Sequence, residues 1–247
     1  TGLRGGTVFD CRLSASSGPA FAITNTSIAI SGVTFQNCAN FNVSNGVGGA
    51  VSASGSIVTI SNCNFFNNMA QTGGAVGVTS GSLAVSSCLF QNNTATCPNA
   101  ASTVTACSAW GGAIGTVEAS SVSLSGSTFS SNAVNLVLSN VVSNTSQAVG
   151  GGGCISVLYN LNVSGSRVTI DGNAFQGCSV QMSGFNNLSL SSEGSVLNWG
   201  IQFGNTYGGA VSLYYGLSAV SSLDVSNVTS AFTKNQCHRS GIISSVG

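Results

Sequence analysis

Two short sequence boxes alternate along the 247 residues of this chain, and their spacing leaves few folds open. The first box is a glycine pair followed by a small and then a β-branched residue, and its second glycines are Gly49, Gly74, Gly112, Gly153 and Gly209. The second box begins with phenylalanine, at Phe35, Phe65, Phe90, Phe129, Phe175 and Phe232, and most copies end in asparagine three residues later. Phe65 and Phe90 are 25 residues apart, and a recurring spacing of this size indicates a repeated structural unit.

Between the boxes, apolar residues and cysteines alternate with serine, asparagine and other polar residues. The stretches 56–65 and 82–90 show this period of two, which is typical of half-buried strands. A unit of 25 residues is too short for a propeller blade, and it fits one coil of three short strands and three turns. Such coils stack at roughly 4.8 Å to bury their inner faces. The sequence therefore predicts an all-β, single-stranded parallel β-helix (solenoid) of about 8–10 rungs.

Each box has an expected role in this coil. The glycine pair supplies a corner with positive φ and lets successive corners approach closely. The phenylalanine points inward as the large anchor of the core. The asparagine that ends the second box both tolerates the left-handed conformation and hydrogen-bonds to its equivalent one rung away. We therefore expect a column of stacked phenylalanines beside a ladder of asparagines.

The organisation of the chain shows no domain boundary. We expect residues 1–247 to form a single β-helix segment with loop excursions near 94–108 and 133–150, where the boxes are widely spaced. The stretch 186–204 still alternates apolar and polar residues, so we expect it to form a whole rung without boxes.

Charge is scarce, and this excludes several classes of protein. The chain has five Lys or Arg and five Asp or Glu, 4% charged residues in all, against roughly 25% in ordinary soluble domains. Helical bundles need many charged helix formers, and nucleic-acid binding needs a basic stripe, so neither is expected. No apolar run approaches the ~18 residues of a transmembrane helix.

The alternating GGA[ILV] and FxxN boxes quoted above resemble the repeats of the chlamydial polymorphic outer membrane proteins and of secreted proteins of algae and other protists. The resemblance covers nearly the whole chain. It implies a right-handed helix and, from the polymorphic outer membrane proteins, a role as an adhesin. The sequence departs from the pattern at Cys154, which replaces the small residue, and at Cys38 and Cys178, which replace the asparagine.

Nine cysteines favour an oxidising compartment. Cys63 and Cys88 lie two residues before a phenylalanine in consecutive rungs, so they form either a disulfide or a column of buried thiols. Cys97 and Cys107 bracket a loop and are expected to form a disulfide across it. Because nine is odd, at least one thiol is unpaired within the chain, and Cys237 is the candidate. No cysteine and histidine cluster suggests a metal site, and no cofactor is expected.

Asparagine sequons mark candidate N-glycosylation sites, although their number is close to what chance predicts. Asn144 lies in an expected loop and is the best acceptor, and the other candidates are Asn25, Asn42, Asn162, Asn187 and Asn227. Asn92 also fits the sequon, but it belongs to a phenylalanine box, where it is expected to be a turn residue.

Catalytic residues are hard to assemble from this sequence. Enzymes built on this fold cluster acidic and basic groups on one strand face. Here the carboxylates are spread far apart and His238 stands near the end, so we expect no enzyme; the carboxylates are Asp10, Glu118, Asp171, Glu193 and Asp224. A pectin-lyase-like enzyme acting on polysaccharides is the least favoured alternative.

Neither end of the sequence shows a polar cap, and an open rung exposes a sheet edge. We therefore expect a piece of a longer chain or copies that associate end to end. The leading hypothesis is a non-catalytic extracellular structural protein, a β-helix module of a surface appendage or filament. Because its surface is nearly uncharged, either Ser, Thr and Asn side chains solvate it, or N-glycans or neighbouring copies cover it. The alternative is an adhesin stalk that binds a host protein or glycan through a loop such as 133–150.

Overall fold

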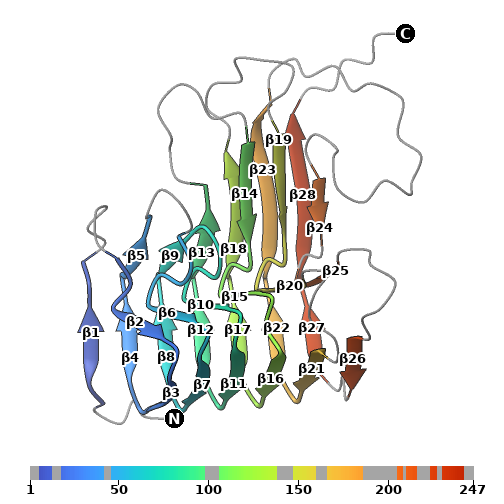
Figure 1. Cartoon of the computed structure of the whole chain (residues 1–247). Coiled ribbons are helices and arrows are strands. Elements are labelled where there is room, and N and C mark those ends of the chain that lie inside the picture. Colours follow the sequence, from blue (N-terminus) through green and yellow to red (C-terminus); the bar gives the residue numbers. More distant parts are fainter. Residues whose placement is uncertain are drawn as a thin grey trace, which may run out of the picture.

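The computed structural model describes residues 6–12, 18–41, 46–97, 106–137, 147–159, 166–185, 205–207, 210–215, 223–226 and 230–241. Within these ranges the chain forms strands and turns and no helix (Figure 1). The strands belong to five sheets, named here A to E.

Four sheets run along the molecule, and the fifth accompanies three of its coils. Sheet A contains β1 (Val8–Asp10), β4 (Thr34–Gln36), β8 (Asn64–Phe66), β12 (Leu89–Gln91), β17 (Thr128–Ser130), β22 (Ala174–Gln176) and β27 (Ala231–Thr233). Sheet B contains β2 (Phe21–Thr24), β6 (Val51–Ser54), β10 (Val76–Thr79), β15 (Ile114–Val117), β20 (Ile155–Tyr159) and β25 (Val211–Tyr215). Sheet C contains β3 (Ser27–Ser31), β7 (Ile57–Ser61), β11 (Ser82–Ser86), β16 (Ser121–Ser125), β21 (Ser166–Asp171) and β26 (Leu223–Ser226). Sheet D contains β5 (Ala39–Asn40), β9 (Met69–Ala70), β13 (Thr94–Thr96), β18 (Ala133–Val137), β23 (Ser179–Phe185) and β28 (Gln236–Gly241). Sheet E contains β14 (Ala106–Trp110), β19 (Gln147–Gly151) and β24 (Asn205–Tyr207).

The chain visits the sheets in the order B, C, A, D and then starts the next coil. One coil is β6, β7, β8 and β9, and its strands pair in parallel with β10, β11, β12 and β13 of the coil that follows. The fold is therefore a parallel β-helix, as predicted. The expected coil of three strands was wrong, because a short fourth strand in sheet D lies between the phenylalanine box and the glycine corner.

The described residues form fewer layers than the sequence predicts. Sheet A holds seven strands, so the described residues form seven layers rather than eight to ten. The stretch 186–204 lies outside the described residues, but β20 pairs directly with β25 and β22 with β27. The described strands β20 and β25, and likewise β22 and β27, therefore belong to adjacent coils.

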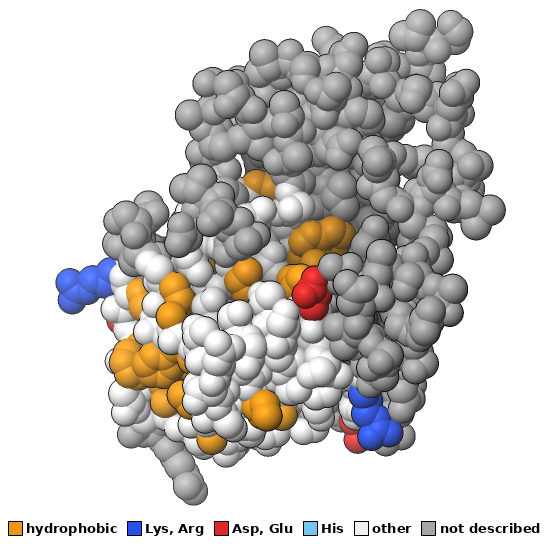
Figure 2. All heavy atoms as spheres, in the orientation of Figure 1, with side chains coloured by type: hydrophobic (Ala, Val, Ile, Leu, Met, Phe, Trp, Pro, Cys, Tyr) orange, Lys and Arg blue, Asp and Glu red, His pale blue; other side chains and the backbone are white. Residues whose placement is uncertain are grey.

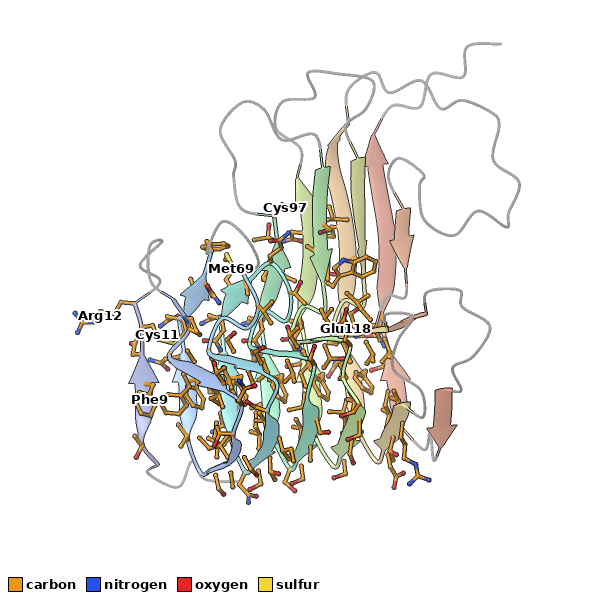
Figure 3. The ribbon with its side chains drawn as sticks, viewed as in Figure 1. Phe9, Cys11, Arg12, Met69, Cys97 and Glu118 are labelled. Carbon is orange, nitrogen blue, oxygen red and sulfur yellow. A yellow bond between two sulfur atoms is a disulfide. The ribbon has the colours of Figure 1, made fainter. Side chains whose placement is uncertain are left out.

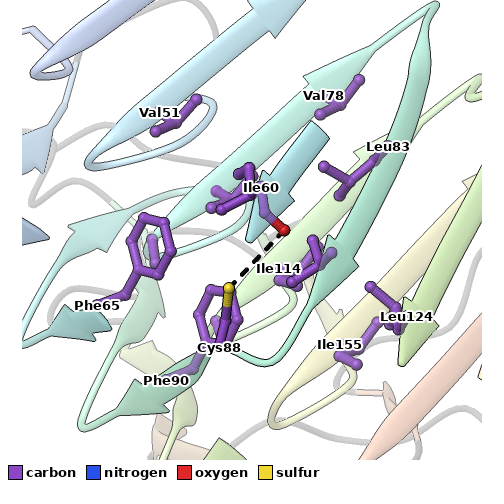
Figure 4. Packing of buried hydrophobic residues seen from close by; sticks show 14 of the residues in the cluster. Val51, Ile60, Phe65, Val78, Leu83, Cys88, Phe90, Ile114, Leu124 and Ile155 are labelled. Atoms are coloured by element: carbon purple, nitrogen blue, oxygen red, sulfur yellow. Dashed lines mark hydrogen bonds between the residues drawn. The ribbon is translucent and has the colours of Figure 1, made fainter. Parts of the chain in front are cut away.

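The predicted phenylalanine column forms the centre of the core (Figure 4). Adjacent rings are stacked with centroid separations of 4.7 to 5.2 Å and interplanar angles of 11° or less, in the series Phe35, Phe65, Phe90, Phe129 and Phe175. All five side chains are buried. The backbone of Phe232 continues the register opposite Phe175, and its side chain lies outside the described set. The separation of the rings matches the layer spacing, because identical side chains repeat at each coil.

The two members of a glycine pair have different tasks. The first, as at Gly73, has the positive φ (+65°) and also lies close to backbone, including the N of Gly115 in the next coil, whereas the second has only the close approach to neighbouring corners. A Cβ at Gly74 would collide with the backbone of the next corner and of sheet D, and the same holds at Gly49 and Gly112. Gly153 lies in a buried corner, and Gly209 is outside the described residues.

The asparagines at the ends of the phenylalanine boxes also divide their tasks, which corrects the prediction that one residue performs both. The third position of the box has the left-handed conformation, as at Asn67 (φ 54°) and Asn92 (φ 55°). The fourth position is buried and builds the ladder. Asn68 donates its side-chain amide to Asn93 at 2.9 Å, and Asn93 donates to Asn132 at 2.9 Å.

Sheets D and E form a projecting flange on one side of the coil (Figure 1). Strands of sheet D lengthen from two residues in β5 to seven in β23, and β14, β18 and β19 pack against one another. The predicted excursions 94–108 and 133–150 therefore begin and end in strands, so they are shorter than expected. Their middle parts, 98–105 and 138–146, lie outside the described residues. The sequence did not indicate the strands at the ends of these excursions, because they lie outside the boxes and are rich in small residues.

Candidate functional site

The predicted acidic residues are not brought together in the described part of the chain. Asp10 lies in the first layer of sheet A, and Asp171 lies at the end of β21, in sheet C of the sixth layer. Glu118 lies at the corner between β15 and β16 and accepts a hydrogen bond from Ser80 Oγ at 3.2 Å. Among the described residues no three His, Cys, Asp or Glu side chains form a metal-binding group.

The remaining titratable residues named from the sequence have side chains that the structure does not describe. The backbone of Asp224 lies opposite Arg167, and that of His238 lies opposite Gln181. Glu193 lies outside the described residues altogether. No catalytic role follows from these positions.

Asp10 is fixed by a local network on the exposed edge strand β1. Its carboxylate accepts hydrogen bonds from Gln36 Nε2 at 2.9 Å, Asn37 Nδ2 at 3.1 Å and the backbone N–H of Arg12 at 3.0 Å. These donors, Gln36 foremost, lower the pKa of Asp10 because they stabilise the charged form. The network joins the first coil to the second through side chains.

Two disulfides that the sequence analysis did not pair lie inside the coil. Cys11 is bonded to Cys38, which joins the first coil to the second with a Cα–Cα distance of 4.7 Å. Cys154 is bonded to Cys178 within a single coil, with a Cα–Cα distance of 5.4 Å. Cys38, Cys154 and Cys178 are the residues that depart from the boxes. Cys154 and Cys178 replace the expected box residues within the same repeat unit, and this coincidence was the sequence signal that they are partners.

Cys97 is also disulfide-bonded, as predicted for that residue. The side chain of its predicted partner Cys107 lies outside the described set, and so does that of Cys237. Persistent disulfides are typical of oxidising compartments and of secreted proteins.

Cys63 and Cys88 are free and buried, so of the two open alternatives the disulfide was wrong. The stacking distance suits the Cα atoms of a disulfide. However, residues at equivalent positions of stacked coils have parallel Cα–Cβ bonds, which leaves the Cβ atoms ~4.8 Å apart. A disulfide requires Cβ atoms roughly 3.5–4.5 Å apart. Cys11 and Cys38 do not occupy equivalent positions, because Cys11 lies two residues after Phe9 and Cys38 lies three residues after Phe35, its partner in the pairing of β1 with β4.

The two thiols influence each other's ionisation. Interaction with Cys88 lowers the pKa of Cys63 to about 7, and the same interaction, together with burial, raises the pKa of Cys88. The backbone N–H of Cys63 donates to Cys88 Sγ at 3.4 Å. The pair therefore holds its first negative charge more readily than an isolated buried thiol would.

The candidate glycosylation sites fall almost entirely outside the described residues. Asn25 is described: it is exposed, at positive φ (48°), in the turn between β2 and β3. The others, Asn42, Asn144, Asn162, Asn187 and Asn227, lie outside the described ranges.

The outward faces of the coil carry mainly short, uncharged side chains. In sheet C, Ser82 lies opposite Ser121 and Ser86 lies opposite Ser125, and all four point away from the core. The space-filling view shows charged side chains only at scattered places on a largely uncharged face (Figure 2). Such a surface offers hydroxyl groups rather than ion pairs to its surroundings.

Three excursions of the chain begin and end at one edge of the flange. The segments 98–105, 138–146 and 186–204 each connect a strand of sheet D to a strand of sheet E. The strands that precede them, β13, β18 and β23, are neighbours in sheet D, and the strands that follow them, β14, β19 and β24, are neighbours in sheet E. The ends of the three excursions therefore lie side by side, which the sequence did not show.

No family model matches the chain, and neither a curated protein nor a solved structure is found to match it. In the described part of the chain no helix is long and apolar enough to cross a membrane.

Proposed function

We propose that the chain is a non-catalytic extracellular structural protein, a β-helix module of a surface appendage or filament. The observation that carries this proposal is the way the described coils are joined from within. Disulfides, stacked phenylalanines and the asparagine ladder all link residues inside the column. A column joined in this way holds its shape without a ligand, as a structural module must.

The N-terminal layer supports association along the axis of the column. Among the described strands, β1, β2, β3 and β5 pair on one side only. Val8 is 56% exposed and Phe9 is 36% exposed, and the ring of Phe9 stacks on Phe35 (Figure 3). An unpaired parallel edge with an apolar core end is a template for another coil. We propose that a second copy of the chain covers it.

The flange favours a second candidate function, an adhesin. The three excursions start from neighbouring strands at one edge of the flange. Binding residues are often carried on loops that a rigid scaffold holds in place. In this alternative the column serves as a stalk, and the flange edge contacts a host protein or a glycan.

Imaging and labelling test the two candidates. Antibodies against the purified chain should label the outside of intact source cells. Electron microscopy should show rods that join end to end, with an axial repeat of ~4.8 Å. Isolated rods that bind glycan arrays or cells would favour the adhesin. Labelling confined to the cell interior, or turnover of a polysaccharide panel, would exclude the structural role.

Disulfide closure of the sixth coil should contribute to stability. Replacing Cys154 and Cys178 together by serine should lower the free energy of unfolding by about 3 kcal/mol, because the closed loop of the unfolded chain is lost. Urea unfolding with and without the substitutions measures this change. A matched control is Cys88→Ser, because Cys88 is a buried cysteine that forms no disulfide, and an equal loss in that variant would contradict the assignment.

A further inference from the structure

The buried thiols Cys63 and Cys88 occupy the same place in consecutive coils. Cys63 lies between β7 and β8, Cys88 lies between β11 and β12, and these strands pair in register. Each sulfur contacts two carbonyl oxygens, and the two pairs occupy equivalent positions in consecutive coils. Cys63 Sγ lies 3.2 Å from Ser61 O and 3.7 Å from Ile30 O.

Cys88 repeats this arrangement one layer further. Its Sγ lies 3.2 Å from Ser86 O and 3.8 Å from Ile60 O, as the close-up shows for Ile60 (Figure 4). Because the two side chains point in the same direction, their sulfurs are separated by about one layer, ~4.8 Å. This separation is far longer than a disulfide bond and close to twice a metal–thiolate bond of ~2.3 Å.

We propose that Cys63 and Cys88 bind one soft metal ion that accepts two ligands in line, such as Cu(I), with Ag(I) as its laboratory substitute. Thiolates select soft ions over hard ones. Zinc needs four ligands, and among the described residues no third metal-binding side chain joins the pair. The site is an internal bridge between two coils.

Each thiol donates a hydrogen bond to a carbonyl oxygen, Cys63 Sγ to Ser61 O and Cys88 Sγ to Ser86 O, and metal binding replaces both of these bonds. Binding breaks two S–H bonds, forms two metal–sulfur bonds and releases the thiol protons to water, without transfer of electrons. The N–H of Cys63, which donates to Cys88 Sγ, stabilises the negative charge that remains on the complex.

The chain itself supplies the matched variants. Ser127 occupies the same place in the next coil, where its Oγ accepts a hydrogen bond from Cys88 N at 3.1 Å and lies 3.1 Å from Ser125 O. Serine is therefore compatible with this position, so Cys63→Ser and Cys88→Ser should fold. Ser127→Cys should extend the thiol column by one layer and add a second binding position.

The test is an anaerobic titration of the purified chain, disulfides intact, with Cu(I) or Ag(I). Thiolate-to-metal absorption and calorimetry should show one ion per chain, lost in Cys63→Ser and in Cys88→Ser, kept in Cys237→Ser and raised to two in Ser127→Cys. The ion should also raise the Tm of the native chain but not that of Cys63→Ser. Absence of binding, unchanged stoichiometry in Cys63→Ser, or peptide masses showing a Cys63–Cys88 disulfide would overturn the proposal.

Discussion

Replacing Gly74 by alanine should unfold the coil around it, at a cost of about 5 kcal/mol in the free energy of unfolding, which is exceptional for one methyl group. A Cβ at this position would collide with the carbonyl oxygen of Gly112 and would lie 2.6 Å from both the N and the O of Thr94. All of these are backbone atoms held by neighbouring coils, so none can move away cheaply. Thermal unfolding followed by circular dichroism measures the loss.

Two other glycines separate this steric effect from backbone strain. Gly126 has φ +54° but has only Ser87 Oγ near its virtual Cβ, at 4.0 Å, so Gly126→Ala should cost about 1 kcal/mol. Gly18 has no atom within 4 Å and no positive φ, so Gly18→Ala should change stability by less than ~0.5 kcal/mol. Equal losses in all three variants would show that close packing of the corners does not determine stability.

Replacing Asn93 by alanine should cost about 4 kcal/mol, because at least two buried polar groups lose their partners at ~1–3 kcal/mol each. Asn93 Oδ1 accepts from the backbone N of Asn68 at 3.0 Å and from Asn68 Nδ2 at 2.9 Å. Its Nδ2 donates to Phe65 O at 3.0 Å and to Asn132 Oδ1 at 2.9 Å. Urea denaturation gives the change in free energy.

The control for the ladder lies two residues away. Gln91 is exposed on the outer face of β12, so Gln91→Ala should stay within ~0.5 kcal/mol of the parent chain. Asn93→Asp keeps one acceptor but places a second carboxylate oxygen beside the acceptors Phe65 O and Asn132 Oδ1, so at neutral pH its loss should be at least as large as that of Asn93→Ala. A small effect of Asn93→Ala would mean that water replaces the amide, and the ladder would then contribute little to the column.

The candidate site could be predicted only in part. The sequence identified Cys63 and Cys88 as neighbours in space, because their distance from Phe65 and Phe90 is the same. It could not decide between disulfide and thiols, since that choice depends on the direction of the Cα–Cβ bonds. Cys11 and Cys38 were not paired, because Cys11 lies outside the boxes that the sequence analysis identified and only the coordinates bring the two residues together.

The repeat by itself determined the winding of the chain, the inward column of phenylalanines and the glycine corners. These features depend on contacts between equivalent residues of adjacent coils. Because every copy of a box lies in the same environment, the recurring residues are enough to predict these contacts. The tertiary structure alone decided the fourth strand, the pairing of the cysteines and the meeting of three excursions at the flange. The flange strands β13, β14, β18 and β19 carry no box, and their partners lie far away in sequence. Their pairing becomes visible only when the coils are stacked in register, because the register is set by the phenylalanine column and not by the strands themselves.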